Sequence, residues 1–160
     1  MSITFSTGEL INIAIGNERK GIAFYDVMTR SADSASSREI FQFLANMERE
    51  HIQIFQGMLA DVDQYKVRED YAREYGDYVQ ALVDTAVFSD ELVNSEMATQ
   101  ADSDIKALEL AIGAEKDAIL FYYMMRELMP QRAHATVDKI IAEEKSHLRQ
   151  LSELKRKQVA

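Results

Sequence analysis

One pattern of this sequence occurs twice, and the repetition restricts the folds that the chain can adopt. Residues 14–25 (AIGNERKGIAFY) align without a gap with residues 111–122 (AIGAEKDAILFY). Farther along each half, residues 48–52 (EREHI) match residues 144–148 (EKSHL). Each half thus supplies one lone glutamate followed by one Glu-x-x-His motif, and we expect the two halves to fold alike.

The composition favours helices over strands. The chain contains one proline and six glycines, and it is rich in alanine, leucine, glutamate, methionine and lysine, which favour helix. A strand-and-turn fold would need turn residues about every ten positions. Apolar residues also recur at helical spacing, so we predict an all-α protein.

Capping signals mark the helices of the first half. Ser6 and Glu9 have the spacing of a capping box, so the first helix is expected to run from about residue 7 to 30. A polar segment follows it. Ser36 and Glu39 have the spacing of a second capping box, which predicts the start of the next helix.

The second half follows the same plan. Asp102 or Ser103 can cap a third helix, and Pro130 separates it from a fourth. The less regular pattern between the halves predicts a partly helical crossover. Two hairpins joined by one long crossover form a known variety of four-helix bundle. The expected architecture is a single domain (1–160) with helical hairpins at 7–64 and 103–157 and the crossover at 65–102.

The two Glu-x-x-His motifs have the spacing of a metal site. Positions three apart on a helix share a face, so the glutamate and histidine of each motif can present an oxygen and a nitrogen to one ion. The motifs and the lone glutamates also fall in phase with apolar positions, so they are expected to point into the bundle. The candidate metal ligands are Glu18, Glu48, His51, Glu115, Glu144 and His147.

The number of buried carboxylates indicates how many ions to expect. Each unpaired charge in an apolar core loses several kcal/mol of hydration. Two divalent cations would balance four glutamates if both histidines are neutral. A mixed carboxylate and imidazole set suits iron first and manganese second, because zinc takes fewer ligands and calcium avoids nitrogen. We therefore expect two iron ions per chain, with manganese or a mixed pair as the alternative.

Several of these residues also have an ordinary explanation. One Glu-x-x-His motif is typical of a surface ion pair, and only its repetition with a matching glutamate favours a metal site. Tyr25 and Tyr122 each follow a lone glutamate by two turns, so they are either hydrogen-bond donors to a ligand or core aromatics. Glu91 and Glu96 are interpreted as part of a solvated acidic face. His134 has no glutamate three positions earlier and is interpreted as a surface histidine.

Charge and cysteine content exclude several classes of protein. With 27 acidic and 18 basic side chains, the net charge of −9 disfavours nucleic acid and anionic membrane partners. The absence of cysteine excludes disulfides, thiolate catalysis, zinc ribbons and cysteine-bound iron centres. The apolar runs are too short to cross a bilayer, and the N-terminal segment lacks a signal pattern. We expect a cytoplasmic protein.

The repeated ligand pattern resembles the rubrerythrin-like branch of the ferritin-like superfamily, with its duplicated helical hairpin, over nearly the whole chain. The resemblance implies a ferritin-like four-helix bundle and a di-iron site on the same six residues, with Glu48 and Glu144 bridging and Glu18 and Glu115 terminal. Rubrerythrin proper also has a rubredoxin-like iron centre on four cysteines, which this chain cannot build. It carries a further glutamate where this sequence has Ala118, so the site is closer to the six-ligand pattern of bacterioferritin-like centres.

The resemblance implies a non-haem di-iron oxidoreductase that uses hydrogen peroxide or dioxygen and receives electrons from a separate donor protein. Two alternatives stay open: an iron-oxidising storage or carrier protein, and a structural protein whose metals hold the hairpins together without turnover. A homodimer is expected, because the apolar crossover residues Val87 and Phe88 are expected to be exposed.

Overall fold

The structure is a computed structural model of the chain, and it describes residues 5–61, 69–88 and 103–160. This part of the chain contains helices and no strands, so the predicted all-α class is confirmed. None of the described helices combines the length and the apolar character that crossing a membrane would require. The helices are α1 (Thr7–Ser31), α2 (Ala35–Ala60), α3 (Glu69–Asp84), α6 (Asp104–Leu128) and α7 (Gln131–Val159).

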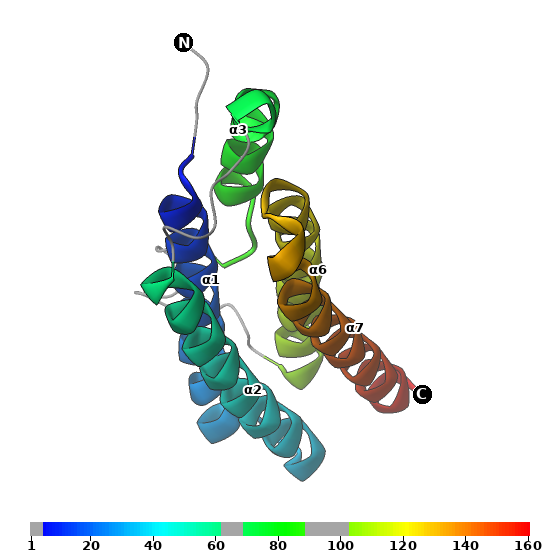
Figure 1. The fold of residues 1–160 in the computed structure, drawn as a ribbon. Helices are drawn as coiled ribbons and strands as arrows, with labels where there is room; N and C mark the ends of the chain where they lie inside the picture. Colours follow the sequence, from blue (N-terminus) through cyan, green and yellow to red (C-terminus); the bar gives the residue numbers. More distant parts are fainter. Residues whose placement is uncertain (1–4, 62–68, 89–102) are drawn as a thin grey trace.

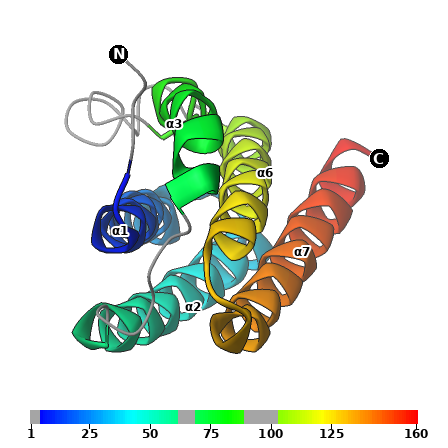
Figure 2. The ribbon, with the colours of Figure 1, turned by 45° about the horizontal axis from the view of Figure 1, so that its top comes forward.

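Two helical hairpins form the bundle (Figure 1). α1 packs along α2 after a short turn, and α6 packs along α7 in the same way. α1 also contacts α6, and α2 contacts α7, so the two hairpins lie side by side. α3 belongs to the crossover and packs on α6, at the end of the bundle where α1 begins (Figure 2). The predicted pair of hairpins with a partly helical crossover is confirmed.

Side chains cap the helices at most of the predicted positions. The Glu9 backbone N–H donates to Ser6 Oγ at 3.1 Å, and the Ser6 backbone N–H donates to the Glu9 carboxylate at 2.6 Å. This is the predicted capping box, and it satisfies two N–H groups that the first turn leaves unpaired. Ser103 caps α6, and Pro130 stands at the N-cap position of α7, as the sequence predicts.

The prediction of a capping box at Ser36 and Glu39 is wrong. α2 begins earlier, at Ala35, because Ser34 Oγ accepts the Ser37 backbone N–H at 3.0 Å. The Ser34 backbone N–H in turn donates to the carboxylate of Asp104 at 2.9 Å. Asp104, in the first turn of α6, thus binds the turn between α1 and α2 next to the start of α2.

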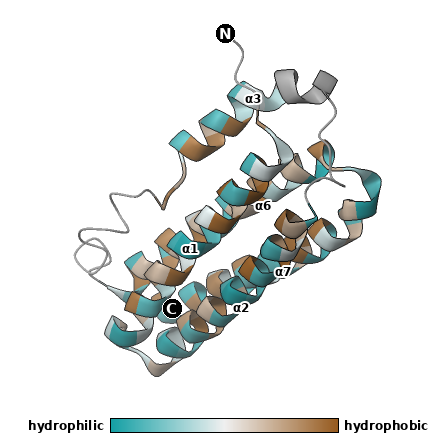
Figure 3. Ribbon diagram, turned by 60° about the vertical axis from the view of Figure 1, so that its left-hand side comes forward, coloured by the Kyte–Doolittle hydropathy of each residue, from teal (hydrophilic) through white to brown (hydrophobic). Residues whose placement is uncertain are grey.

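Two apolar clusters fill the bundle, one at each end. One cluster contains the beginning of α1 and the end of α6, and the other contains the end of α1 and the beginning of α6. Figure 3 shows that each bundle helix carries both hydrophobic and hydrophilic positions. Between the two clusters, each bundle helix contributes one buried glutamate: Glu18, Glu48, Glu115 and Glu144.

The end of the crossover is folded onto the bundle. Phe88 is only 7% exposed, and its ring centroid lies 4.6 Å from that of Phe24. The Val87 backbone N–H donates to the Asp117 carboxylate at 2.8 Å. A Cβ at Gly113 would lie 2.9 Å from Val87 Cγ2, so glycine permits this close approach. The prediction that Val87 and Phe88 are exposed is therefore wrong, and the homodimer that it supported stays an untested prediction.

We expect Phe88→Ala to lower the free energy of unfolding by about 3 kcal/mol, because truncating a buried aromatic ring leaves a cavity. The matched control is Leu120→Ala on α6, where the side chain is 49% exposed and the expected change is below about 0.5 kcal/mol. Chemical denaturation of the metal-free protein measures both values. Equal effects of the two substitutions would contradict the docking of Phe88 in the core.

Candidate metal centre

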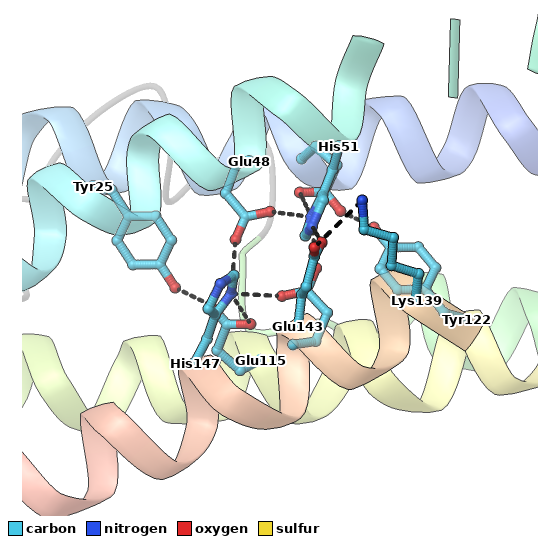
Figure 4. A network of polar contacts seen from close by, with 10 residues as sticks. Tyr25, Glu48, His51, Glu115, Tyr122, Lys139, Glu143 and His147 are labelled. Carbon is cyan, nitrogen blue, oxygen red and sulfur yellow. Dashed lines mark hydrogen bonds and ion pairs between the residues drawn. The ribbon is translucent and has the colours of Figure 1, made fainter. Parts of the chain in front are cut away.

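Six ionisable side chains lie in the middle of the bundle, between the two apolar clusters. Each of them is at most 4% exposed, so the prediction that they point into the bundle is confirmed. Figure 4 shows the labelled members of this group pointing toward one another, with Tyr25 and Tyr122 on opposite sides. The group consists of Glu18 from α1, Glu48 and His51 from α2, Glu115 from α6, and Glu144 and His147 from α7.

The potential ligand atoms of these residues form two overlapping sets. In each set, one atom from every member lies within 4.8 Å of the others. Glu48 and Glu144 belong to both sets, whereas each lone glutamate and each histidine belongs to one. Two adjacent positions that share two carboxylates are what a two-metal centre requires. The sets are Glu18, Glu48, His51 and Glu144, and Glu48, Glu115, Glu144 and His147.

Two carboxylate oxygens of the group lack a hydrogen-bond partner. Among the described residues, neither Glu115 Oε2 nor Glu144 Oε1 accepts a hydrogen bond, although both atoms are buried. The histidines approach them only as ion-pair partners: His51 Nδ1 lies 3.1 Å from Glu144 Oε1, and His147 Nδ1 lies 3.8 Å from Glu115 Oε2. A buried anionic oxygen without a partner is strongly unfavourable, and a coordinated cation would remove this cost. A donor set of four carboxylates and two imidazoles therefore fits a pair of divalent ions.

In the metal-free protein, protons balance part of the charge. Burial lowers the pKa of His51, but the carboxylates of Glu144 and Glu18 outweigh it and raise this pKa to about 11. For His147, burial is likewise outweighed by Glu115 and Glu144, and the pKa rises to about 9. Burial and then the charge of Glu144 raise the pKa of Glu115 to about 8. The group thus holds protons near neutral pH that metal ions would displace.

Two buried tyrosines hold the lone glutamates. Tyr25 Oη donates to Glu115 Oε1 at 2.7 Å, and Tyr122 Oη donates to Glu18 Oε1. Each tyrosine therefore supports the glutamate of the other hairpin. Burial, followed by the adjacent glutamate charge, raises the pKa of both tyrosines well above the usual value, so both remain protonated donors. Both tyrosines also belong to the apolar clusters, so the structure agrees with both explanations that the sequence left open.

Comparison with known proteins agrees with this geometry. The sequence model of the rubrerythrin family matches residues 9–155. This chain belongs to the rubrerythrin family. It is also similar to the crystal structure of a candidate ferritin-like diiron-carboxylate protein from Thermotoga maritima, with 29% identity, 98% of each chain covered and a TM-score of 0.66. The predicted ferritin-like fold is confirmed. A search among curated proteins finds no match.

One polar residue beside this rubrerythrin-family site was not singled out by the sequence. His51 Nε2 donates to Glu143 Oε2 at 2.8 Å, so a carboxylate lies behind the imidazole on the side away from the other glutamates. Glu143 directly precedes Glu144, and the residue that matches it in the first half is Met47. This mismatch in the repeat is the signal that could have drawn attention to Glu143.

A cavity of about 50 Å³ adjoins the site on the side of the lone glutamates. Glu18, Glu48 and Glu115 line it, whereas neither histidine of the site does. The crossover contributes apolar side chains to the lining, which are Leu82, Val83, Ala86 and Phe88, and the polar residues Asn17, Lys20 and Asp117 line it as well. The cavity therefore borders three of the four glutamates and the apolar side chains of the crossover.

Small residues leave the space that this cavity occupies. Gly21 and Ala118 both line it, as expected from their place next to the lone glutamates. A Cβ at Gly21 would meet Glu48 Cγ at 3.7 Å, which is ordinary van der Waals contact. The sequence resemblance implies a further glutamate at the position of Ala118, and here the methyl group of Ala118 lines the cavity instead.

The remaining sequence candidates lie elsewhere. His134 is half-buried rather than fully exposed, and its Nε2 donates to the Met129 carbonyl oxygen at 3.0 Å. This contact belongs to the turn between α6 and α7, so His134 has a structural explanation. Glu91 and Glu96 lie outside the described residues.

The stability of the metal-free protein should fall as pH rises from about 6.5 to 9. A group with a higher pKa in the folded state keeps its proton over a pH range in which the unfolded chain has lost it. The free energy of unfolding therefore decreases as pH rises through that range. For His51 the range runs from 6.5 to about 11, and for His147 from 6.5 to about 9.

Urea denaturation of chelator-treated protein at several pH values measures this fall. His147→Gln should reduce the slope between pH 6.5 and 9, because one of the groups whose pKa is raised in the folded protein is then missing. A free energy of unfolding that is constant or rises with pH over this interval would contradict the conclusion that the buried histidines hold protons in the metal-free protein.

Proposed function

We propose that this chain is a non-haem di-iron oxidoreductase that reacts with hydrogen peroxide or dioxygen. The observation that carries the proposal is the pair of overlapping ligand sets that share Glu48 and Glu144. Each set contains three carboxylates and one imidazole, which suits iron or manganese better than zinc or calcium. In this proposal Glu48 and Glu144 would contribute to both ion positions, and Glu18 and Glu115 would each contribute to one.

Charge balance supports two ions rather than one. Two divalent cations balance four glutamates when both histidines are neutral, and they displace the protons that the metal-free site holds. A single ion would leave an excess of negative charge in a core that is closed at both ends by apolar clusters. It would also leave one complete ligand set without an ion.

The tyrosines prepare the terminal glutamates for this binding mode. Because Tyr25 occupies Glu115 Oε1, the other oxygen of that carboxylate is Oε2, which accepts no hydrogen bond among the described residues and lies 3.8 Å from His147 Nδ1. In the other half, Tyr122 occupies Glu18 Oε1, and Glu18 Oε2 lies 3.7 Å from His51 Nδ1. Each lone glutamate thus presents one fixed oxygen to the ion position of its own ligand set.

The cavity supports a small oxidant as the reactant. A ferrous pair, when bound, supplies two electrons that with two protons reduce hydrogen peroxide to two water molecules. At about 50 Å³, the cavity has room for dioxygen or hydrogen peroxide beside the glutamates, and apolar side chains form part of its lining. Since the sequence has no cysteine for a second iron centre, a separate protein would return the two electrons.

Anaerobic loading with ferrous iron, followed by stopped-flow mixing with hydrogen peroxide or dioxygen, tests the proposal. We expect two irons per chain by mass spectrometry, rapid oxidation that is faster with peroxide, and repeated turnover when a reductant is supplied. His147→Ala should retain fewer than two irons with unchanged helical content, and the control His134→Ala should retain two. Redox-silent binding would favour the structural alternative, and oxidation into a large iron-filled oligomer would favour storage.

We expect Tyr25→Phe to lower the metal affinity of the Glu115 position about 10–100-fold, because outer hydrogen bonds to a ligand have effects of this size. The stoichiometry of two ions and the helical content should not change. Tyr123→Phe is the matched control, since that ring is 42% exposed. Competition with a chelator of known affinity measures both variants, and equal affinities would show that Tyr25 acts only in packing.

A further inference from the structure

The two histidines of the centre have different surroundings. His51 lies between the glutamates of the site and an outer carboxylate (Figure 4). Its Nδ1 faces the site, at 3.3 Å from Glu48 Oε2 and 3.1 Å from Glu144 Oε1. Its Nε2 donates to Glu143 Oε2 at 2.8 Å. A metal ion on Nδ1 would therefore leave this outer hydrogen bond in place.

His147 has an apolar neighbour instead. Its Nδ1 also faces the site, at 3.0 Å from Glu144 Oε2. Within the described part of the chain, no side chain accepts a hydrogen bond from its Nε2. Its ring instead meets Phe43 edge to face, with 5.8 Å between the ring centroids. The two imidazoles therefore differ although the six candidate ligands match between the halves.

The sequence repeat explains this difference. Glu143 on α7 reaches His51 on α2 from the position just before Glu144. By the symmetry of the repeat, the residue that would reach His147 from α2 is Met47, just before Glu48. A thioether carries no charge and is a weak hydrogen-bond acceptor. The first half thus lacks the carboxylate that the second half provides.

Glu143 lies partly at the surface. Its side chain is 26% exposed, and Lys139 Nζ lies 4.0 Å from its other oxygen, Oε1. This lysine is on the same helix, one turn earlier, and it faces solvent, so this ion pair is weak. The imidazole N–H of His51 is therefore the main contact that orients the carboxylate.

A carboxylate behind a metal-bound imidazole fixes the tautomer and the ring orientation, and it makes the imidazole a stronger ligand. We propose that Glu143 is a positioning residue that strengthens metal binding at the position of Glu18 and His51. This position then binds its ion more tightly than the position of Glu115 and His147, and the centre fills in two ordered steps. This inference rests on the proposed two-metal function, and it adds an order of binding that the matched ligand sets alone do not predict.

Anaerobic titration of the metal-free full chain with manganese(II), in competition with a chelator, tests the order of binding. The wild type should bind two ions in two resolved steps. Glu143→Met should weaken the first step about 10–100-fold and bring the two steps together, while the total stays at two. Glu143→Gln keeps an uncharged acceptor, so the affinity of its first step should lie between those of the wild type and Glu143→Met. Met47→Glu should strengthen the second step.

Two further measurements locate the effect. Crystals grown with one equivalent of manganese(II) should show anomalous density next to Glu18 and His51. Glu153→Met removes one carboxylate from an exposed part of α7 and should leave both steps unchanged, which controls for net charge. Circular dichroism should show equal helical content in all variants.

The outcomes separate the two proposals. Two equal steps in the wild type, or an unchanged first step in Glu143→Met, would overturn the ordered filling and leave the two-metal centre intact. If the wild type binds neither manganese(II) nor ferrous iron, the proposed function itself fails. Anomalous density next to Glu115 and His147 at one equivalent would reverse the assigned order and overturn the inference.

Discussion

The burial of four carboxylates in the middle of a helical bundle is the constraint on which the rest of this structure depends. The four glutamates are at most 4% exposed, so solvent relieves little of their charge, and protons or cations must balance it. In the metal-free protein, the two histidines and Glu115 hold protons that serve this purpose. The same groups must lose those protons when metal binds, so folding, protonation and metal binding are coupled.

The duplication explains why neither hairpin is sufficient. Each hairpin supplies one lone glutamate and one Glu-x-x-His pair, but each ligand set draws members from both hairpins. The tyrosine contacts also cross between the halves, since Tyr25 holds Glu115 and Tyr122 holds Glu18. The interface between the hairpins and the candidate metal centre are therefore the same region, and docking of the two halves assembles both at once.

The sequence predicted the features that follow from the period of a single helix. It did not predict the features that depend on contacts between distant segments. Spacing along each helix was sufficient to identify the six buried ionisable residues and the capping box at Ser6. The start of α2 at Ala35 depends on contacts of Ser34, including one with α6, and the burial of Phe88 depends on its packing against α1. Glu143 was missed because its partner, His51, lies on a helix far away in sequence. Periodicity carries no information about such pairs.

The two halves match in their candidate ligands and differ in what surrounds them. Glu143 stands behind the imidazole of one ligand set, on the side away from the cavity. On the cavity side, the crossover brings Phe88 within 6.4 Å of the Tyr25 ring, and Tyr25 holds Glu115 of the other set. The position of Glu18 and His51 is thus supported through its histidine, and the position of Glu115 and His147 is linked to Phe88 of the crossover through Tyr25. Because the crossover occurs once in a chain whose hairpins occur twice, the surroundings of the two positions cannot be equivalent.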